Sequence, residues 1–467
     1  MRTLFLTLCY ASFFIVGVSA PFVLTLGYLW VDTFLPQTLA YGVISQLPVS
    51  QIVAIGAIGS YFVLDRRDPP RLSFITVLLI LFAAWVTIST FTWAVLPGPA
   101  QVKWSAVVKT LLFTPFIPLV IRSRVQIEAF LQIWLFGFAI NYLPPGLKAL
   151  LSGGGYGRDL GIGGNGVGGF ALADDARLAM IAFMLVPIIL FLCKHTILLP
   201  RIWLTRAMYL AIIVISFGAA YGTYERTAVV VGAVLMGLLW LKSRHKVILA
   251  VGFVLCTAVA VNFVSPDWLE RMSTMSDSHE ASAEHRLDVW MWTLGYVSEH
   301  PLGGGFEVYI IDHAGAVRPD GTRASIAYHN DFFEVLAEQG WPGLAIFVAL
   351  IGSSVLYLRS AARRARAYPQ LAWVPDLAVA LQMALVLQLT GGSFVALGYH
   401  PPLYMIFALA ISLREYVHRV AKATQSGAAA TANADRGRSN APLAPLAGAA
   451  AGLRALRSPA RTLGPQS

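Results

Sequence analysis

Apolar runs of about 20 residues recur along most of this 467-residue chain, and they restrict its fold more than any other feature. A helix of that length is what is needed to cross a hydrocarbon core roughly 30 Å thick. Charged residues make up only 12% of the sequence and the mean hydropathy is +0.67, whereas soluble domains are about one quarter charged. The sequence therefore predicts an all-α, polytopic membrane protein with about 12 transmembrane helices.

The candidate spans are the apolar runs that lie between polar segments. They cover residues 3–33, 45–64, 74–96, 104–121, 126–142, 175–194, 203–221, 226–241, 246–264, 331–358, 375–395 and 402–416. The first run is too long for one straight helix, and we expect it to break near Pro21. A hairpin at that point would raise the count to 13.

Basic residues cluster in every second gap between these spans, which is the pattern that orients membrane proteins with their positive loops in the cytoplasm. The clusters are Arg66, Arg67 and Arg71; Arg122 and Arg124; Lys194, Arg201 and Arg206; Lys242, Arg244 and Lys246; Arg359, Arg363, Arg364 and Arg366; Arg414, Arg419 and Lys422. We therefore expect both termini to be cytoplasmic. Topology accounts for the net charge of +10, so no nucleic-acid partner is expected.

Two of the alternate, outer gaps are long. The transmembrane domain, residues 1–422, would carry a Gly-rich outer loop at 143–174 and a larger outer loop at 265–330 that contains short helices. The Gly-rich loop has no phosphate-binding GxxxxGK[ST] pattern, which favours a simple flexible loop. The Ala-, Pro-, Gly- and Arg-rich tail, residues 423–467, is predicted to be a disordered cytoplasmic segment.

Two arginines are expected at the outer face. Arg226 enters a span from outside, so it either reaches back to the interface or faces an anion, and a guanidinium fork fits phosphate oxygens. Arg286 stands at the start of a predicted amphipathic helix with helically spaced apolar residues Leu287, Trp290, Met291 and Leu294. An arginine there could equally belong to a solvated face.

His329 precedes the point where the outer loop re-enters the membrane, with Asn330 or Asp331 as a helix N-cap. The helix dipole disfavours an imidazolium at this position, and a neutral imidazole can act as a general base. The alternative is a histidine that only caps the helix or lies at the interface.

Neither a metal nor a cofactor is expected. The sequence from His279 to His285, HEASAEH, is not the HExxH zinc pattern, and the three cysteines all fall inside apolar runs. Two guanidiniums and an imidazole on one face, without a metal, suit a lipid-linked phosphate or pyrophosphate substrate. The fixed charges would stabilise the leaving pyrophosphate while the imidazole takes a proton from an attacking hydroxyl.

Three segments around these residues resemble the O-antigen ligase/polymerase superfamily of bacterial membrane proteins. They are TYERTAVVVGAVLMGLLWL, RLDVWMWTLGYVSEHPLGGGF and YHNDFFEVLAEQGWPGLAIF. Together with the upstream KWSAVVKTLLFTPFIPLVIRSR, they look most similar to the exosortase-associated O-glycosylation ligases. The resemblance implies a metal-independent glycosyltransferase of the bacterial inner membrane. It would transfer a glycan from an undecaprenyl-pyrophosphate donor to an acceptor hydroxyl of a glycolipid, protein or polysaccharide at the periplasmic face.

The resemblance also implies roles for particular residues. His329, Arg286 and Arg226 match the catalytic residues, Glu338 matches an acidic residue that orients the site or packs, and Lys109 is a further candidate phosphate ligand. One departure is Glu225, which stands where the family usually has serine and would weaken pyrophosphate binding locally.

Three alternatives stay open. A polysaccharide polymerase and a protein O-oligosaccharyltransferase share this core and its chemistry. A transporter of lipid-linked glycans is less favoured, because it predicts internal repeats and charged residues at mid-membrane, and the sequence has neither in evidence.

Overall fold

The computed structural model describes residues 2–17, 19–36, 47–65, 69–152, 175–223, 225–248, 251, 279–311 and 327–439. Within these ranges every regular element is a helix. The chain divides into two compact units, Met1–His418 and Arg419–Ser467. The first unit contains all the candidate site residues.

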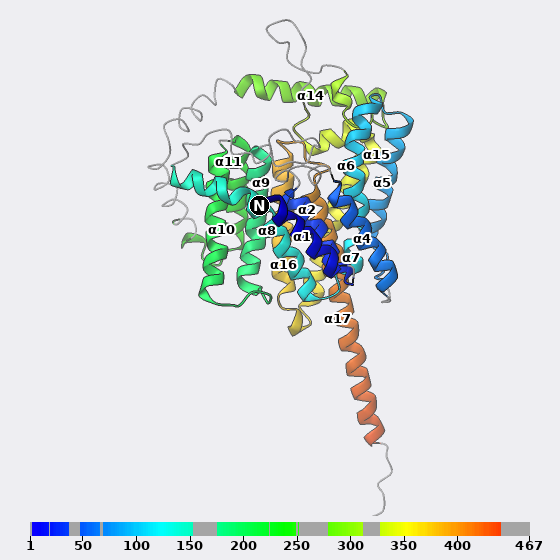
Figure 1. The fold of residues 1–467 in the computed structure, drawn as a ribbon, viewed down its shortest axis with the longest axis vertical. Coiled ribbons are helices and arrows are strands. Elements are labelled where there is room, and N and C mark those ends of the chain that lie inside the picture. Colours follow the sequence, from blue (N-terminus) through cyan, green and yellow to red (C-terminus); the bar gives the residue numbers. More distant parts are fainter. Residues whose placement is uncertain are drawn as a thin grey trace, which may run out of the picture. The chain divides into compact units, whose positions relative to one another are not determined.

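The helices of the first unit form a bundle (Figure 1). Their bounds are α1 Arg2–Gly17, α2 Pro21–Phe34, α4 Val49–Leu64, α5 Phe74–Thr92, α6 Pro97–Phe113, α7 Ile117–Val120, α8 Arg124–Leu151, α9 Asp175–His195, α10 Trp203–Gly222, α11 Arg226–Lys242, α14 His279–Glu299, η2 Val308–Ile310, α15 Asp331–Ala365, η3 Pro369–Leu371, α16 Val374–Gly392 and α17 Pro401–Ser439. Helix α17 continues from the first unit into the second.

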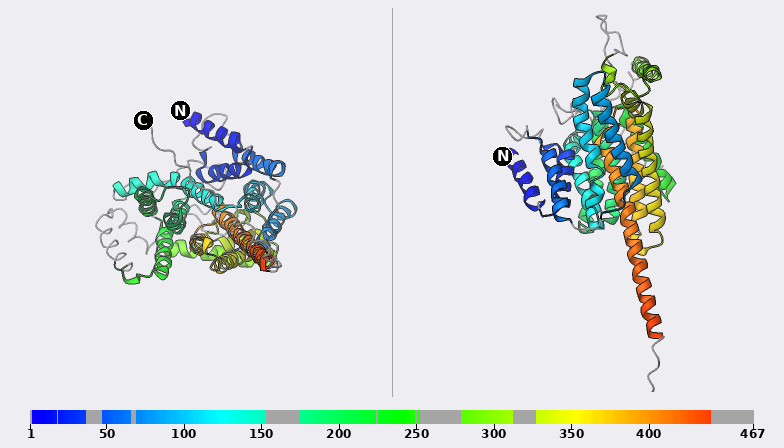
Figure 2. Two further views of the ribbon diagram at one scale, coloured as in Figure 1. Left: turned by 90° about the horizontal axis from the view of Figure 1, so that it is seen from below. Right: turned by 90° about the vertical axis from the view of Figure 1, so that its right-hand side faces the viewer.

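Seven helical segments among the described residues are long and apolar enough to cross a membrane. They correspond to predicted spans at 74–96, 104–121, 126–142, 175–194, 203–221, 331–358 and 375–395. The first predicted run does break before Pro21, giving α1 and α2, and α1 packs on α2 at the edge of the bundle (Figure 2). The predicted span 246–264 lies almost entirely outside the described residues. The predicted total of about 12 spans stays a prediction.

Two helices extend beyond one bound of their predicted spans. Helix α6 already begins at Pro97, a residue whose fixed φ suits the first helical turn. Helix α8 continues through Pro144 and Pro145 to Leu151, because neighbouring helices in a bundle can compensate for the lost backbone hydrogen bonds. The Gly-rich loop predicted at 143–174 therefore starts later, and residues 153–174 are outside the described ranges.

Part of the segment that the sequence predicts to be a disordered tail is helical. Helix α17 continues past Ala423 to Ser439. This stretch is rich in alanine, the strongest helix former, and the next proline after Pro402 is Pro442. The composition predicted disorder because a Pro- and Gly-rich segment follows these alanines in the sequence.

Basic clusters from different gaps meet at one end of the bundle. The Arg124 guanidinium donates a hydrogen bond to the His195 carbonyl at 2.9 Å and lies 5.0 Å from the centre of the Trp373 ring. Lys194 pairs with Asp376 at 2.7 Å. Helix α14 lies across the opposite end (Figure 1). The alternation read from the sequence thus corresponds to two distinct ends of the helix bundle.

At the end near α14, a glycine-rich turn packs against a break in α15. The helical conformation of α15 is interrupted at Gly340, with φ 65° and ψ −169°. The freed backbone groups bond to the turn, since Gly304 donates to the Ala337 carbonyl at 3.0 Å and Trp341 donates to the Pro301 carbonyl at 3.0 Å. A break of this kind frees carbonyls that a continuous helix would occupy.

Replacing Gly340 with alanine is expected to destabilise the protein by about 2 kcal/mol, because a side chain disfavours this positive φ. An added Cβ would also lie 2.3 Å from the Pro301 carbonyl oxygen and 2.6 Å from the Gly303 nitrogen. The matched control is Gly352→Ala in the same helix, where a Cβ meets no atom within 4 Å. Thermal unfolding in detergent measures both, and equal melting temperatures would contradict the prediction.

Candidate functional site

The structure brings Arg226 and Arg286 into electrostatic range, although 60 residues separate them in the sequence. Arg226 is the first residue of α11, and Arg286 lies in α14. Burial lowers the pKa of the Arg286 guanidinium, the neighbouring Arg226 lowers it further, and Glu225 opposes the shift. Two guanidiniums that disfavour each other's charge form a place where an anion is stabilised.

Most of the helically spaced apolar residues of α14 are not buried in the protein. Leu287, Met291 and Leu294 are exposed, and the buried residues of the helix are Val289, Thr293 and Val297. The spacing is helical in both sets, so periodicity could not decide between them. The exposed apolar residues suit a helix that lies at a membrane interface, which removes the need to bury them in protein.

His329 stands at a corner of the chain with φ 48°, in the left-handed region that few non-glycine residues adopt. Of the two predicted candidates, Asn330 and Asp331, Asn330 is the N-cap of α15, and its side-chain oxygen accepts hydrogen bonds from the Phe332 and Phe333 amides at 2.9 and 3.3 Å. The cap fixes the backbone just after the histidine. The imidazole therefore belongs to a corner held by local hydrogen bonds.

Helix α14 contacts this corner directly through Trp290. The indole donates a hydrogen bond to the Tyr328 carbonyl at 3.0 Å and stacks on Phe333 with ring centres 5.0 Å apart. Arg286 lies one turn before Trp290, so both project from the same side of the helix. The arginine pair and His329 are thus linked through one aromatic contact.

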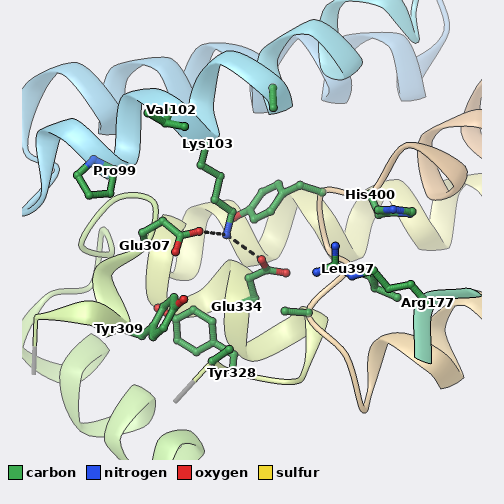
Figure 3. Close-up of a pocket in the computed structure, with 14 residues that line it drawn as sticks. Pro99, Val102, Lys103, Arg177, Glu307, Tyr309, Tyr328, Glu334, Leu397 and His400 are labelled. Atoms are coloured by element: carbon green, nitrogen blue, oxygen red, sulfur yellow. Dashed lines mark hydrogen bonds and ion pairs between the residues drawn. The ribbon is translucent and has the colours of Figure 1, made fainter. Parts of the chain in front are cut away.

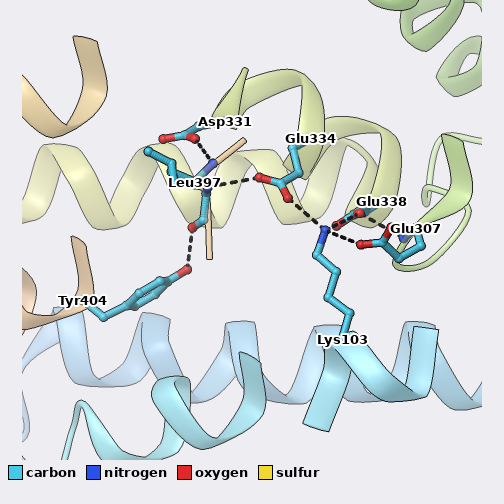
Figure 4. A network of polar contacts seen from close by, with 8 residues as sticks. Lys103, Glu307, Asp331, Glu334, Glu338, Leu397 and Tyr404 are labelled. Carbon is cyan, nitrogen blue, oxygen red and sulfur yellow. Dashed lines mark hydrogen bonds and ion pairs between the residues drawn. The ribbon is translucent and has the colours of Figure 1, made fainter. Parts of the chain in front are cut away.

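A second polar centre was not expected from the sequence. The Lys103 ammonium, on α6, contacts three carboxylates: Glu338 at 2.7 Å, Glu334 at 2.8 Å and Glu307 at 3.2 Å (Figure 4). Two of the three N–H donors of the ammonium form hydrogen bonds, one to Glu334 and one to Glu338, and Glu307 forms an ion pair with it. Glu338, a predicted site residue, is fully buried in this cluster.

The same carboxylates hold the chain around the first turns of α15. Glu338 accepts a hydrogen bond from the Glu307 amide at 2.9 Å, and Glu334 accepts one from the Gly398 amide at 3.0 Å. Asp331 accepts from the Leu397 amide (Figure 4). Glu338 therefore holds the turn that carries Glu307 against α15.

Replacing Lys103 with methionine is expected to cost about 3 kcal/mol of stability, because it leaves three close carboxylates without their cation. Lys103→Arg keeps the charge and should retain part of the stability. The control is Lys109→Met, since six residues place Lys109 about 120° around the helix from Lys103. Thermal unfolding measures the difference, and identical midpoints for the two methionine variants would be evidence against the cluster's importance.

Lys109 itself lies apart from this cluster. It is half-buried in α6 and does not line the cavity described below. If Lys109 binds a phosphate of the donor, Lys109→Met should also lower the rate of glycan transfer.

A cavity of about 450 Å³ opens beside the cluster (Figure 3). We call it the Lys103 cavity. Its polar and aromatic wall consists of Lys103, Arg177, Glu307, Tyr309, Tyr328, Glu334, Tyr399 and His400. Tyr328 immediately precedes His329, so the cavity wall continues into the corner that holds the histidine.

The sequence did not predict a role for Lys103, Glu307 or Glu334. A lysine close to an apolar span needs a partner, and this signal could have singled out Lys103. Its carboxylate partners, however, are more than 200 residues away in the sequence. Only the folded chain identifies them.

Two family models match the sequence. Residues 1–197 match a family of unknown function, DUF5935. Residues 211–348 match the O-antigen ligase family. At the level of the family, this match supports a membrane protein that transfers glycans as a ligase or polymerase. A search of curated proteins found no match to the sequence.

The O-antigen ligase segment contains Arg226, Arg286, His329 and Glu338. Lys103, by contrast, belongs to the DUF5935 segment. The Lys103 cavity is therefore lined by residues from both matched segments, together with Tyr399 and His400 from the C-terminal part of the chain. In the part of the chain that the structure describes, no group of three or more His, Cys, Asp or Glu side chains has an arrangement that could hold a metal ion.

Proposed function

We propose that this protein is a membrane glycosyltransferase that moves a glycan from an undecaprenyl-pyrophosphate donor to an acceptor hydroxyl. The observation that carries the proposal is the approach of Arg286 to Arg226, next to the corner that bears His329. A paired set of guanidiniums suits the four or so charged oxygens of a pyrophosphate better than it suits a neutral ligand.

The reaction assigns a task to each of the three residues. The guanidiniums of Arg226 and Arg286 hold the pyrophosphate and stabilise the charge that it gains as it leaves. His329, kept neutral by the N-terminus of α15, accepts the proton of the acceptor hydroxyl. The acceptor oxygen bonds to the anomeric carbon as the bond from that carbon to the pyrophosphate oxygen breaks, and the electron pair leaves with undecaprenyl pyrophosphate.

The reaction takes place at the periplasmic face of the bacterial inner membrane. This assignment follows from the positive-inside pattern of the basic clusters, which puts the end bearing α14 outside and the C-terminus in the cytoplasm. The gathering of Arg124, Lys194 and their neighbours at the other end of the bundle supports it. The reaction uses no metal, because fixed guanidiniums supply the positive charge that a metal would otherwise provide.

Deleting the gene tests the proposal in cells. The deletion is expected to remove one glycoconjugate (lipopolysaccharide, glycoprotein or exopolysaccharide) and to cause the lipid-linked donor to accumulate. The missing product distinguishes a ligase from an O-oligosaccharyltransferase or a polymerase. Donor retained on the cytoplasmic leaflet would instead indicate a transporter and refute the proposal.

A transfer assay with the purified full-length chain in proteoliposomes distinguishes a ligase from a polymerase. A ligase needs an acceptor that carries no polyprenyl group, whereas a polymerase lengthens its own lipid-linked donor. The single-variant tests of His329 and Arg286 use the same assay.

A further inference from the structure

The Lys103 cavity differs in charge from the arginine pair. Its lysine is surrounded by Glu307, Glu334 and Glu338, so three carboxylates face one ammonium. Arg177 at another part of the wall balances the excess only in part. A pyrophosphate entering this cavity would meet the carboxylates that surround its lysine, and like charges at close range disfavour binding.

The same wall is suited to a neutral ligand with many hydroxyl groups. Each carboxylate oxygen can accept more than one hydrogen bond, so Glu307 and Glu334 can still accept hydrogen bonds from hydroxyl groups. Burial, followed by the charge of Glu307, raises the pKa of Tyr309 to about 12, so that its phenol stays neutral. Tyr309, Tyr328 and Tyr399 add apolar ring surface with a polar end.

The cavity also has a suitable position and size. Its wall includes Tyr328, the residue before His329, and the carbonyl of Tyr328 accepts the hydrogen bond from Trp290 of α14. A ligand in the cavity and an anion at the arginine pair would therefore lie on either side of the histidine corner. Small-molecule sites commonly have volumes of about 300–1,000 Å³, and about 450 Å³ falls within that range.

We propose that the Lys103 cavity binds the acceptor, a neutral and hydroxyl-rich saccharide end, and directs one hydroxyl to His329. This inference rests on the proposed function and adds to it a site for the second substrate. Donor and acceptor are thereby separated by charge: the pyrophosphate binds at the arginine pair, and the neutral acceptor binds among tyrosines and carboxylates.

Filling the cavity tests this inference. Ala106 lines the cavity, so Ala106→Trp should occupy its space, whereas Gln101→Trp adds the same side chain at an exposed position on the same helix that does not line it. Each variant is produced in the deletion strain to measure the glycoconjugate. Its affinity for undecaprenyl pyrophosphate is measured on the purified full-length protein in nanodiscs.

Ala106→Trp is expected to lower the glycoconjugate at least about tenfold while the affinity for undecaprenyl pyrophosphate stays within about twofold. Gln101→Trp should change neither quantity. A loss of undecaprenyl-pyrophosphate binding in Ala106→Trp would mean that the donor occupies the cavity, and unchanged transfer would mean that the cavity is not used. Either result overturns the inference.

Glu307→Gln provides a second variant that keeps the side-chain volume and covers the case in which Ala106→Trp does not fold. It should raise the KM for the acceptor identified in the deletion strain by about fivefold, without changing the KM for the donor. Equal effects on both KM values would contradict the assignment. If the wild-type chain itself restores no glycoconjugate, the proposed function fails, and this result is distinct from any effect of the variants.

Discussion

Replacing His329 with asparagine is expected to lower the rate of glycan transfer by about 10³-fold, the typical contribution of a general base. Asparagine is chosen because His329 has φ 48°, and asparagine tolerates this left-handed conformation better than other non-glycine residues. The variant therefore removes the imidazole while keeping the backbone corner. The initial rate of transfer in proteoliposomes, at saturating donor and acceptor, measures the loss.

His329→Ala serves as the comparison for this prediction. Alanine removes the base and also lacks the polar side chain with which histidine and asparagine tolerate the left-handed conformation, so it should lose some stability as well as activity. The asparagine variant should unfold at nearly the wild-type temperature and bind undecaprenyl pyrophosphate normally. Near-wild-type transfer by His329→Asn would rule out proton transfer to this residue.

The second large effect is expected at Arg286. Arg286→Ala should lower kcat/KM for the donor by about 10³-fold, the loss typical of removing a group that stabilises developing negative charge. Arg286→Lys should recover only part of it, because an ammonium lacks the fork that holds two phosphate oxygens. The affinity for undecaprenyl pyrophosphate should fall in parallel, and nanodisc binding measures that affinity.

A double variant tests whether the two arginines act on one ligand. Arg226→Ala combined with Arg286→Ala should cost less than the product of the two single effects, since both residues would contact the same pyrophosphate. Arg244→Ala, an exposed arginine beyond the end of α11, is the control and should have no effect. Strictly multiplicative losses would indicate that the arginines contribute to separate sites.

Replacing Glu225 is expected to strengthen the binding of undecaprenyl pyrophosphate, whereas the arginine variants weaken it. Its carboxylate lies close enough to Arg286 to raise the pKa of that residue, so it competes with an anion for the guanidinium. Glu225→Ser should therefore increase the affinity for undecaprenyl pyrophosphate several-fold at low salt, with a smaller gain at high salt. A decrease would show that the carboxylate positions Arg286 instead.

The sequence by itself determined the features that depend on neighbouring residues. Apolar runs specified the helices, the proline at residue 21 marked the break between α1 and α2, and the cap of α15 was narrowed to Asn330 or Asp331. Alternating basic clusters indicated two ends of the bundle. Such signals are local because helix length, capping and backbone breaks depend on a few consecutive residues.

The same charge alternation predicted that Arg226, Arg286 and His329 lie on one side of the membrane. The structure adds the contacts: the electrostatic proximity of the two arginines and the bond from Trp290 to the Tyr328 carbonyl. The order of the spans along the chain determines which residues share a face of the membrane. Lateral distance within that face depends on how the helices pack.

Only the tertiary structure decided which face of α14 is buried and which residues surround Lys103. The exposed and buried sets of α14 have the same period, so their burial depends on the corner at Tyr328 and on η2. Lys103 meets Glu334 and Glu338 across 231 and 235 residues of chain. No local pattern encodes such a pairing, because it arises only when the folded chain brings α15 to Lys103 of α6. The break at Gly340 then lets the turn at 301–307 pack against α15, which brings Glu307 to the same ammonium.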